Sequence, residues 1–330
     1  MTDERVADIT VVVPVLNKMP DLLRCVASLA RQTIRPAQVI FVDDGSTDGG
    51  VEYLRQLDWP NVVVLTRPSP GPGGYAARNC AIRHAVTEWI SFLDADDEWD
   101  AEYLRNVHDL AQNAPSRVGC IFTGYARRRK DDTLVVQKYM QRRGAQGVHE
   151  LDFQAFLDAW LADRECPIWT GAASFRRTVL LESGLFPEHR CKRGGDKDLW
   201  LRAMNLGTAL HCNKALATYR TDSTNMVTVS VATTEPHCIT QTIEALLETA
   251  PPELGSRLRK LHNLEAFLYV LHAARAGRFG RAPLDTFYVR DNPILYALSR
   301  AISSPTTAPL WPILEWLKRQ SSRRHKITAS

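Results

Sequence analysis

Three aspartates fall within four residues, Asp94, Asp96 and Asp97, at the end of the apolar run of residues 89–94. Neighbouring carboxylates repel one another unless a cation or hydrogen-bond donors offset their charge. Hard cations such as Mg²⁺ take oxygen ligands, usually a carboxylate or two together with substrate phosphates and water. The pattern therefore predicts a metal that bridges to a diphosphate, and its alternative is a solvated turn at the start of a helix.

Two further carboxylate positions could contact a ligand. Asp43 and Asp44 end a second β-branched run, where they could accept hydrogen bonds from a base or a ribose hydroxyl; a plain Asp-Gly turn is the alternative. Asp196 follows Gly194 and Gly195, and glycines let a backbone approach a ligand closely. Asp196 is therefore a candidate base that takes a proton from an acceptor, or a simple helix cap.

A glycine-rich string, GPGGYA at residues 71–76, supports two interpretations. It matches the dinucleotide pattern G-x-G-x-x-A, and Asp94 comes ~20 residues later, as that pattern expects. However, residues 67–70 separate the glycines from the preceding run, whereas the dinucleotide turn follows its strand directly. The other interpretation is a loop beside a diphosphate, with Arg78 as a cation for phosphate or base.

Apolar runs that alternate with helical patterns must position these residues. Four runs are predicted as buried strands: residues 9–15, 39–43, 62–66 and 89–94. Apolar residues at helical spacing follow Pro20, and the same spacing recurs over residues 75–86 and 103–111. The alternation predicts an α/β fold with a mostly parallel central sheet and flanking helices, whose ligands bind beyond the carboxyl ends of strands.

Composition excludes several classes of protein. Apolar residues make up 45% of the 330 residues, which is enough for a core, and the net charge of +4 is too small to indicate nucleic-acid binding. The acidic start does not resemble a signal peptide, and no apolar stretch is long enough to span a membrane. The seven cysteines are scattered, which predicts reduced thiols in the cytoplasm.

Five segments in order over residues 9–223 resemble the family 2 glycosyltransferases with the A-type fold. They are the opening VVVPVLNKMPDLLRCVASLARQT, then VIFVDDGSTDGG, GPGGYAARNCAI, FLDADDEW and GGDKDLWLR. The resemblance implies an inverting transfer of a sugar from a nucleoside diphosphate, UDP by default, to an acceptor hydroxyl. It also implies a place in the synthesis of a polysaccharide, a glycolipid or another glycoconjugate, with a sugar or a lipid-linked molecule as acceptor.

The resemblance assigns the donor site residue by residue. The nucleotide is held by Pro14, Asn17, Asp43 or Asp44, with Arg78 as the added cation. Asp94 and Asp97 engage ribose and diphosphate, and Asp96 is the direct ligand of Mn²⁺ or Mg²⁺, with Asp94 beside it.

The acceptor side follows from the same resemblance. Asp196 is the base, and Trp169, Gly171 and Trp200 lie where aromatic rings could stack on sugars; core packing is the alternative for both tryptophans. Two positions depart from the family pattern. Gly195 replaces the usual glutamate before the base, and the segment YRTDSTN lacks the usual histidine, so Arg220, with Asp222 as a second candidate, must serve or that role is absent.

These observations predict a catalytic domain made of two halves, followed by a C-terminal helical region, and they leave two other functions open. Residues 1–125 form the nucleotide-sugar half, residues 126–230 the acceptor and base half, and residues 231–330 a helical region. The glycine string alone favours a nicotinamide-dependent oxidoreductase, and Gly195 favours a non-catalytic protein that binds sugar nucleotides.

The C-terminal tail has its own alternatives. Trp311, Ile313, Leu314, Trp316 and Leu317 precede a run of basic residues. Such a segment could rest on an anionic membrane surface, which would place a cytoplasmic enzyme peripherally on the inner face of the membrane. The alternative is a packed helix or a homodimer contact through the C-terminal helices.

Overall fold

A computed structural model describes residues 6–69, 71–144, 147–191, 193–223, 238–275 and 284–306 of the chain. It divides into two compact units, Met1–Val231 and Ala232–Ser330. The predicted tail segment from Trp311 onwards lies outside the described residues.

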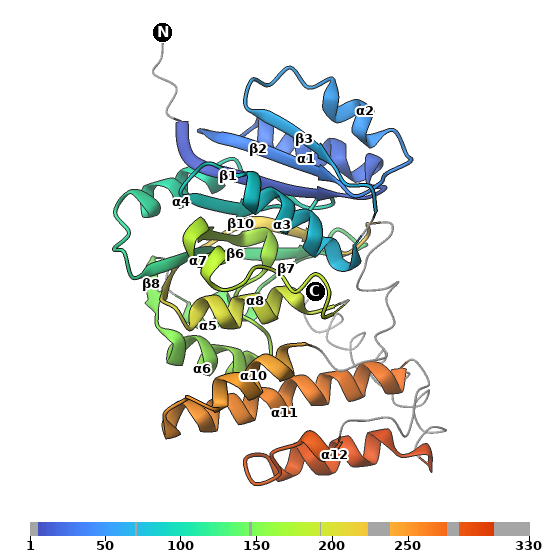
Figure 1. Cartoon of the computed structure of the whole chain (residues 1–330), viewed down its shortest axis with the longest axis vertical. Helices are drawn as coiled ribbons and strands as arrows, with labels where there is room; N and C mark the ends of the chain where they lie inside the picture. The colour runs from blue at the N-terminus through green and yellow to red at the C-terminus, as the bar shows by residue number, and fades with distance from the viewer. Residues whose placement is uncertain are drawn as a thin grey trace, which may run out of the picture. The chain divides into compact units, whose positions relative to one another are not determined.

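The first four strands of the sheet in the first unit are parallel (Figure 1). In sheet order they are β3 (Val62–Thr66), β2 (Arg35–Asp43), β1 (Val6–Val15) and β4 (Trp89–Phe92). Val15 pairs with Asp43 in register, and Asp43 pairs with Thr66. The segments that leave these strands therefore emerge at one edge of the sheet, as the sequence predicts.

A reversed strand joins this half of the sheet to the other. β9 (Ala173–Arg176) is antiparallel both to β4 on one side and to β6 (Val118–Arg128) on the other. β4 and β6 consequently run in the same direction, and β10 (Thr208–Arg220) is parallel to β6. The amino end of β9 therefore lies at the same edge as the carboxyl ends of β1, β2, β4, β6 and β10.

Short antiparallel strands complete the ten-stranded sheet of the described residues. They are β5 (Glu98–Trp99) and β8 (Val148–Leu151), which pair with β10, and β7 (Leu134–Val136), which pairs with β6. The sheet is thus mixed: the expected parallel pairing holds for β1 to β4 and for β6 with β10. β7 forms a hairpin with the end of β6.

Helices cover both faces of this sheet. α1 (Met19–Ala30) and α4 (Tyr103–Gln112) pack on the face that carries Val11 and Val13. α3 (Tyr75–His84) and α8 (Gly195–Met204) cover the other face, where Phe186 stacks on Tyr75 and packs edge-on against Trp200. The remaining helices of this unit are α2 (Gly50–Arg55), α5 (Lys138–Arg143), α6 (Phe153–Asp163) and α7 (Arg177–Glu182), with the short turns η1 (Pro72–Gly74) and η2 (Thr170–Ala172).

A buried histidine lies in the second half of the sheet. His211 of β10 is fully buried and packs on Phe122, Tyr139 and His149. Neither ring nitrogen is hydrogen-bonded within the described part of the chain. Burial lowers the pKa of His211 to about 3, and the charges of His149 and Arg143 act in the same direction.

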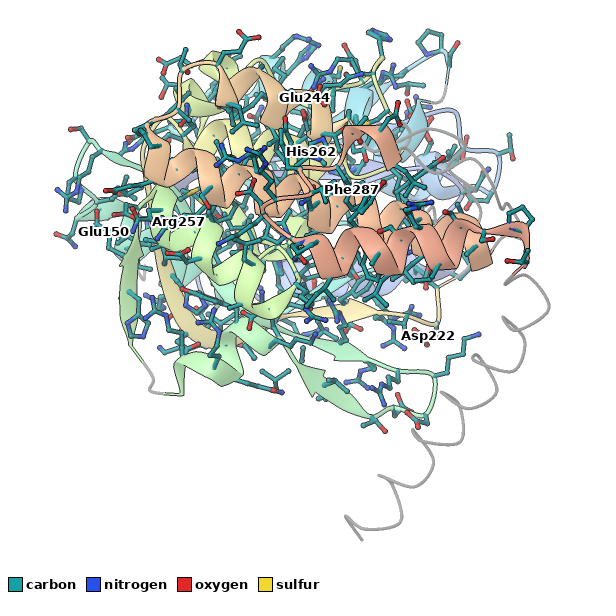
Figure 2. The ribbon with its side chains drawn as sticks, turned by 90° about the horizontal axis from the view of Figure 1, so that it is seen from below. Glu150, Asp222, Glu244, Arg257, His262 and Phe287 are labelled. Carbon is teal, nitrogen blue, oxygen red and sulfur yellow. The ribbon has the colours of Figure 1, made fainter. Side chains whose placement is uncertain are left out.

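The second unit is helical, as the sequence predicts for its residues. It contains α10 (Ile239–Leu247), α11 (Pro252–Arg275), η3 (Leu284–Thr286) and α12 (Pro293–Ser303). The buried His262 of α11 lies 3.4 Å from the Glu244 carboxylate of α10 (Figure 2). Asn263 donates to the Tyr288 carbonyl and accepts from its N–H, both at 2.9 Å. These contacts tie α11 to its neighbours within the unit.

Two further features are the hydropathy of the helices and the state of the cysteine thiols. Among the described residues, no helix combines the length and the apolar character needed to cross a bilayer. Cys25, Cys80, Cys120, Cys166 and Cys212 are free thiols. Cys191 and Cys238 are disulfide-bonded, so the expectation that all seven thiols are reduced is wrong for these two.

Candidate active site

Asn17 and Asp43 join the ends of β1 and β2. The Asp43 carboxylate accepts from the Ser46 N–H at 2.9 Å and the Gly45 N–H at 3.2 Å, which closes a turn directly after β2. Asn17, held at φ 51°, accepts from the Thr47 N–H at 2.8 Å through its side-chain oxygen. Both side chains therefore shape the loop at the predicted nucleotide edge.

Asp44 organises the glycine-rich loop. Its carboxylate forms an ion pair with Arg67 and accepts from the Gly71 N–H at 2.8 Å. Gly74 has a φ of 66°, and a Cβ there would lie 3.4 Å from the Cβ of Pro14. The positive φ favours glycine at position 74, and the loop lies against Pro14, which brings the start of α3 to the end of β1.

Arg78 connects α3 to the acidic loop. Its guanidinium forms an ion pair with Asp94, donates to the Gly73 carbonyl at 2.8 Å and lies over the Phe186 ring. Arg78 is buried, so its charge offsets that of the Asp94 carboxylate.

The three aspartates of the acidic loop differ in exposure. The Asp94 side chain is 27% exposed and the Asp96 side chain 17%, whereas Asp97 is buried. The Asp97 carboxylate accepts from the Arg220 N–H at 2.9 Å, and its other oxygen has no hydrogen-bond partner among the described residues. Burial and the charges of Asp96 and Asp94 raise the pKa of Asp97 well above its ordinary value.

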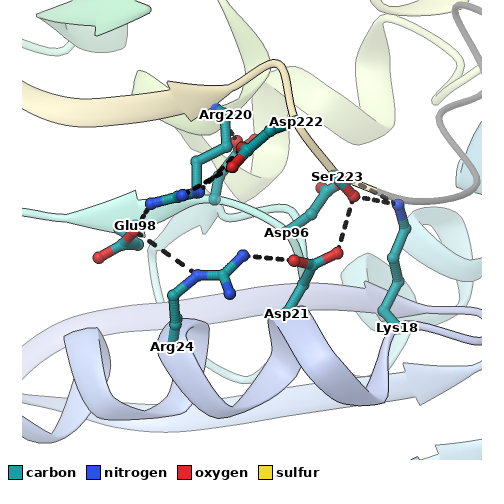
Figure 3. A network of polar contacts seen from close by, with 9 residues as sticks. Lys18, Asp21, Arg24, Asp96, Glu98, Arg220, Asp222 and Ser223 are labelled. Atoms are coloured by element: carbon teal, nitrogen blue, oxygen red, sulfur yellow. Dashed lines mark hydrogen bonds and ion pairs between the residues drawn. The ribbon is translucent and has the colours of Figure 1, made fainter. Parts of the chain in front are cut away.

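A network of side chains surrounds Asp96 (Figure 3). The Lys18 ammonium lies 2.7 Å from the Asp96 carboxylate and donates to the Ser223 hydroxyl at 2.8 Å. Ser223 donates in turn to the Asp21 carboxylate at 2.8 Å. The start of α1, the acidic loop and the segment that leaves β10 are therefore held together at the carboxyl edge of the sheet.

Arg220 forms the other side of this network. Its guanidinium contacts Glu98 at 3.0 Å and Asp222 at 2.9 Å. Because its backbone N–H binds Asp97, Arg220 fixes the acidic loop from β10 through both its backbone and its side chain. It was predicted on the acceptor side, and it lies beside the acidic loop.

Asp196 lies in the first turn of α8 and is half-buried. The Thr170 hydroxyl lies 3.4 Å from its carboxylate. The preceding N–H, that of Gly195, donates to the Tyr75 hydroxyl at 2.8 Å. Burial raises the pKa of the Tyr75 phenol, and the negative charge of Asp196 acts in the same direction. Asp196 thus lies between the glycine-rich loop and the segment that enters β9.

The residues around position 195 explain why it is a glycine. A Cβ at this position would lie 2.8 Å from the Cζ of Tyr75 and 2.9 Å from the Cγ of Pro187. Real Cβ atoms do not approach other atoms this closely without a shift. The glutamate that the family pattern expects here is therefore incompatible with Tyr75 in this position.

Asp198 anchors α8 through buried ion pairs. It is fully buried and forms ion pairs with Arg190 at 3.0 Å and Arg202 at 2.6 Å. Arg202 also donates to the Leu185 carbonyl at 2.8 Å. These contacts hold α8 to the segment after α7 and thereby fix the position of Asp196.

The predicted acceptor residues separate into two environments. Trp169 is half-buried and packs against Tyr125 and Tyr219, with ring centroids 4.6 Å and 5.3 Å away. The carbonyl of the buried Gly171 accepts from the Trp99 indole N–H at 2.7 Å. Trp200 is fully buried and stacks on Phe175 at 4.3 Å. The prediction that Trp200 contacts the acceptor is therefore wrong, because its ring belongs to the core beneath the site.

Comparison with known proteins places this arrangement in a family. A family model described as glycosyl transferase family 2 matches residues 10–183, more than half of the chain. The chain belongs to glycosyl transferase family 2. The family match covers the nucleotide edge, the acidic loop and β9, and it ends before α8.

Curated relatives share the first part of the chain. A poly(ribitol-phosphate) beta-glucosyltransferase of Bacillus spizizenii is 37% identical over 116 residues, 33% of this chain and 18% of that protein. The succinoglycan biosynthesis protein ExoW of Rhizobium meliloti is 34% identical over 108 residues, 31% of this chain and 33% of that protein. The matches therefore span a third or less of these family 2 relatives.

A solved structure shares the whole fold. The crystal structure of S. aureus TarS 1-349 in complex with UDP-GlcNAc has a TM-score of 0.67 and 15% identity, and it covers 92% of this chain and 91% of that chain. The predicted α/β class and A-type glycosyltransferase fold are confirmed.

Family membership also bears on the choice between a transferase and a nicotinamide-dependent oxidoreductase. It favours the transferase over the nicotinamide-dependent enzyme, because the glycine-rich loop belongs to the matched region. Lys18, Tyr75 and Asp198 were not predicted as site residues. Lys18 follows Asn17 directly, Tyr75 follows two glycines, and Asp198 is two residues from Asp196, so each was adjacent to a predicted feature.

Proposed function

We propose that the chain transfers a sugar from a nucleoside diphosphate, UDP by default, to an acceptor hydroxyl with inversion at the sugar carbon. The observation that carries this proposal is that α3 contacts both segments: Arg78 forms an ion pair with Asp94 of the acidic loop, and the Tyr75 hydroxyl accepts from the N–H of Gly195, the residue before Asp196. One helix therefore links the residues assigned to the donor with the residue assigned as the base.

A divalent cation fits the acidic loop. Asp94 and Asp96 offer partly exposed carboxylate oxygens, the donor type that Mg²⁺ and Mn²⁺ prefer. Within the described residues, no group of three or more His, Cys, Asp or Glu side chains is arranged to hold a metal ion. One or two carboxylates with the diphosphate would suffice. The bound ion would offset the charge that develops on the leaving diphosphate.

The protein groups supply the remaining chemistry. The nucleotide lies against Pro14, Asn17 and the turn after β2, with Asp43 fixing that turn and Asp44 fixing the glycine-rich loop. Asp196 takes the proton of the acceptor hydroxyl as the hydroxyl oxygen attacks the sugar carbon from the face opposite the diphosphate. Trp169 borders the acceptor side, where its ring could stack on a sugar.

Donor binding can be tested first by thermal stability. Nucleoside diphosphates, UDP-GlcNAc and NAD would each be added with and without Mn²⁺. At about 100 times its dissociation constant, a ligand stabilises the folded state by roughly 2.7 kcal/mol. We expect a Mn²⁺-dependent shift with a uridine nucleotide in the wild type that is lost in Asp96→Ala. Asp109→Ala, which removes an exposed carboxylate of α4, is the matched control and should keep the shift.

Turnover distinguishes a transferase from a binding protein. Asp196→Asn should bind the donor as the wild type does and should fail to release UDP from UDP-GlcNAc. A wild type that binds the donor tightly and shows no turnover over many acceptors would favour the non-catalytic alternative. A shift with NAD alone would overturn the transferase proposal.

The acceptor and the cellular setting extend the same proposal. The curated relatives include proteins named for poly(ribitol-phosphate) glucosylation and succinoglycan biosynthesis, which supports a polysaccharide or lipid-linked acceptor. We propose a cytoplasmic enzyme that contacts the inner face of the membrane peripherally, although disulfide-bonded cysteines such as Cys191 and Cys238 are rare in that compartment. Sedimentation with anionic liposomes at low salt would support this placement, and failure to sediment would contradict it.

A further inference from the structure

We propose that Lys18 is a built-in competitor of the divalent cation at Asp96, so that the metal binds tightly only together with the nucleotide. This inference rests on the proposed function for the identity of the metal ligand. It concerns a side chain that neither the sequence pattern nor the family match assigns to the site.

The contact itself is short and partly buried. The Lys18 ammonium lies 2.7 Å from Oδ2 of Asp96, and the two side chains are only 12% and 17% exposed. Lys18 is the residue that caps the start of α1, so its backbone is fixed by that helix. The close approach of an ammonium and a carboxylate shielded from water is a charge-assisted hydrogen bond, the stronger kind.

An ammonium and a divalent cation cannot share this oxygen without cost. Both are positive, and repulsion between them is weakly screened where side chains are withdrawn from water. A metal that binds Asp96 must therefore displace Lys18 and lose the attraction of that ion pair.

The surrounding charges leave little attraction for a free metal ion. Arg78 already offsets the charge of Asp94, and Lys18 offsets that of Asp96. The charges of these two partly buried carboxylates are thus offset before any ligand arrives. A nucleoside diphosphate adds several negative charges and phosphate oxygens as further ligands, which tips the balance toward the metal.

The displaced ammonium has a second partner. It donates to the Ser223 hydroxyl at 2.8 Å, and that hydroxyl donates to Asp21 (Figure 3). Lys18 can therefore leave Asp96 and keep Ser223. Because coupling between two binding events is reciprocal, a residue that weakens metal binding without nucleotide makes the nucleotide and the metal depend on each other.

The test measures Mn²⁺ binding by electron paramagnetic resonance, without and with UDP, on the full chain. The variants are Lys18→Met, which removes the cation, and Lys18→Gln, which keeps a donor for Asp96 and Ser223 and removes only the charge. Lys214→Met is the matched control, because the Lys214 ammonium donates only to Asn106 among the contacts of its side chain in the described structure, at 2.9 Å.

We expect both Lys18 variants to bind Mn²⁺ about tenfold more tightly than the wild type when no nucleotide is present, a coupling of ordinary size. With UDP bound, the difference should shrink, because Lys18 has already left Asp96. Lys214→Met should match the wild type in both conditions. The proposal is overturned if Lys18→Gln binds free Mn²⁺ as weakly as the wild type or more weakly.

Asp96→Asn separates this proposal from the function on which it rests. Loss of UDP-dependent Mn²⁺ binding in Asp96→Asn, with unchanged free-metal affinity in both Lys18 variants, would refute the competitor and keep the metal site. Retention of UDP-dependent Mn²⁺ binding in Asp96→Asn would refute the metal assignment, and the Lys18 proposal with it.

Discussion

Replacing Gly195 with alanine tests how tightly the start of α8 is packed. The new Cβ would lie 2.8 Å from the Cζ of Tyr75 and 2.9 Å from the Cγ of Pro187. Tyr75 is 5% exposed and stacks on Phe186, so its ring has no free space into which to move. The residues must shift apart, and the hydrogen bond from the Gly195 N–H to the Tyr75 hydroxyl lengthens.

The magnitude follows from opposing contributions. Overpacking a well-filled site costs about 1–3 kcal/mol, and a weakened buried hydrogen bond costs about 1 kcal/mol. Replacing a helical glycine with alanine stabilises by up to about 1 kcal/mol. We therefore expect Gly195→Ala to lower the free energy of unfolding by about 2 kcal/mol, measured by urea denaturation.

The matched control is Gly50→Ala. Gly50, like Gly195, is the first residue of a helix and follows a glycine cap. The nearest atom to its added Cβ is the tip of the Asp48 carboxylate, at 3.1 Å, so a change within about 0.5 kcal/mol is expected.

Removing the obstructing ring provides the decisive comparison. Tyr75→Ala opens the space beside residue 195, so the double variant with Gly195→Ala should be more stable than the sum of the two single effects predicts. Strict additivity, or a Gly195→Ala protein as stable as the wild type, would refute the packing argument. On the proposed mechanism the single variant should also lose turnover, because Asp196 shifts with its helix.

Three further variants, each measured by urea denaturation, probe two supports of the site and one buried histidine of the sheet. Asp198→Ala leaves Arg202 without its buried carboxylate, and we expect a loss of about 3–5 kcal/mol. Asn79→Ala breaks both 2.9 Å hydrogen bonds to the backbone of Phe186, with an expected loss of about 2–3 kcal/mol. His211 has a folded-state pKa of about 3, below its ordinary 6.5, so the unfolded chain binds the proton first. The wild type should therefore lose stability as the pH falls below about 6.5, by up to about 1.4 kcal/mol per pH unit. His211→Phe should lack this part of the loss. If the free energy of unfolding falls equally steeply with pH in the wild type and in His211→Phe between pH 8 and pH 5, that reasoning is contradicted.

Local patterns in the sequence account for the parts of the fold that were predicted correctly. The runs that became β1, β2 and β4 form buried strands because their side chains are apolar on both faces, as β4 shows by complete burial. Residues 62–66 also form a strand, β3, but none of its residues is buried. The prediction of a buried strand there is wrong, because β3 lies at the end of the strand order of the described residues. The helix after Pro20 follows from Leu22, Val26 and Leu29, which face the core. Burial and periodicity are properties of neighbouring residues, so one sequence is enough to reveal them.

Contacts between distant residues could not be predicted in this way. Lys18 and Asp96 are 78 positions apart, and Tyr75 and Gly195 are 120 apart. No local pattern specifies either pair. β9 has only four residues and carries no signal for its direction, so its antiparallel pairing was not foreseen.

The error at Trp200 has a physical cause. An aromatic residue one turn after a candidate base lies on the same side of a helix as that base. However, only the first turn of α8 reaches the ligand edge. Leu199, Trp200 and Leu201 are all fully buried, so the helix enters the core immediately after Asp196.

The reversed direction of β9 has a consequence for how such a protein can diversify. Because β9 runs opposite to its neighbours, the segment that enters it arrives at the same edge as the segments that leave β1, β2 and β4. In the proposed transferase, the acceptor side would be built from connections, the hairpin after β6 and the approach to β9, that are separate in the chain from those around the nucleotide. Insertions or exchanges in these connections can remodel acceptor preference during evolution while the donor half is inherited intact.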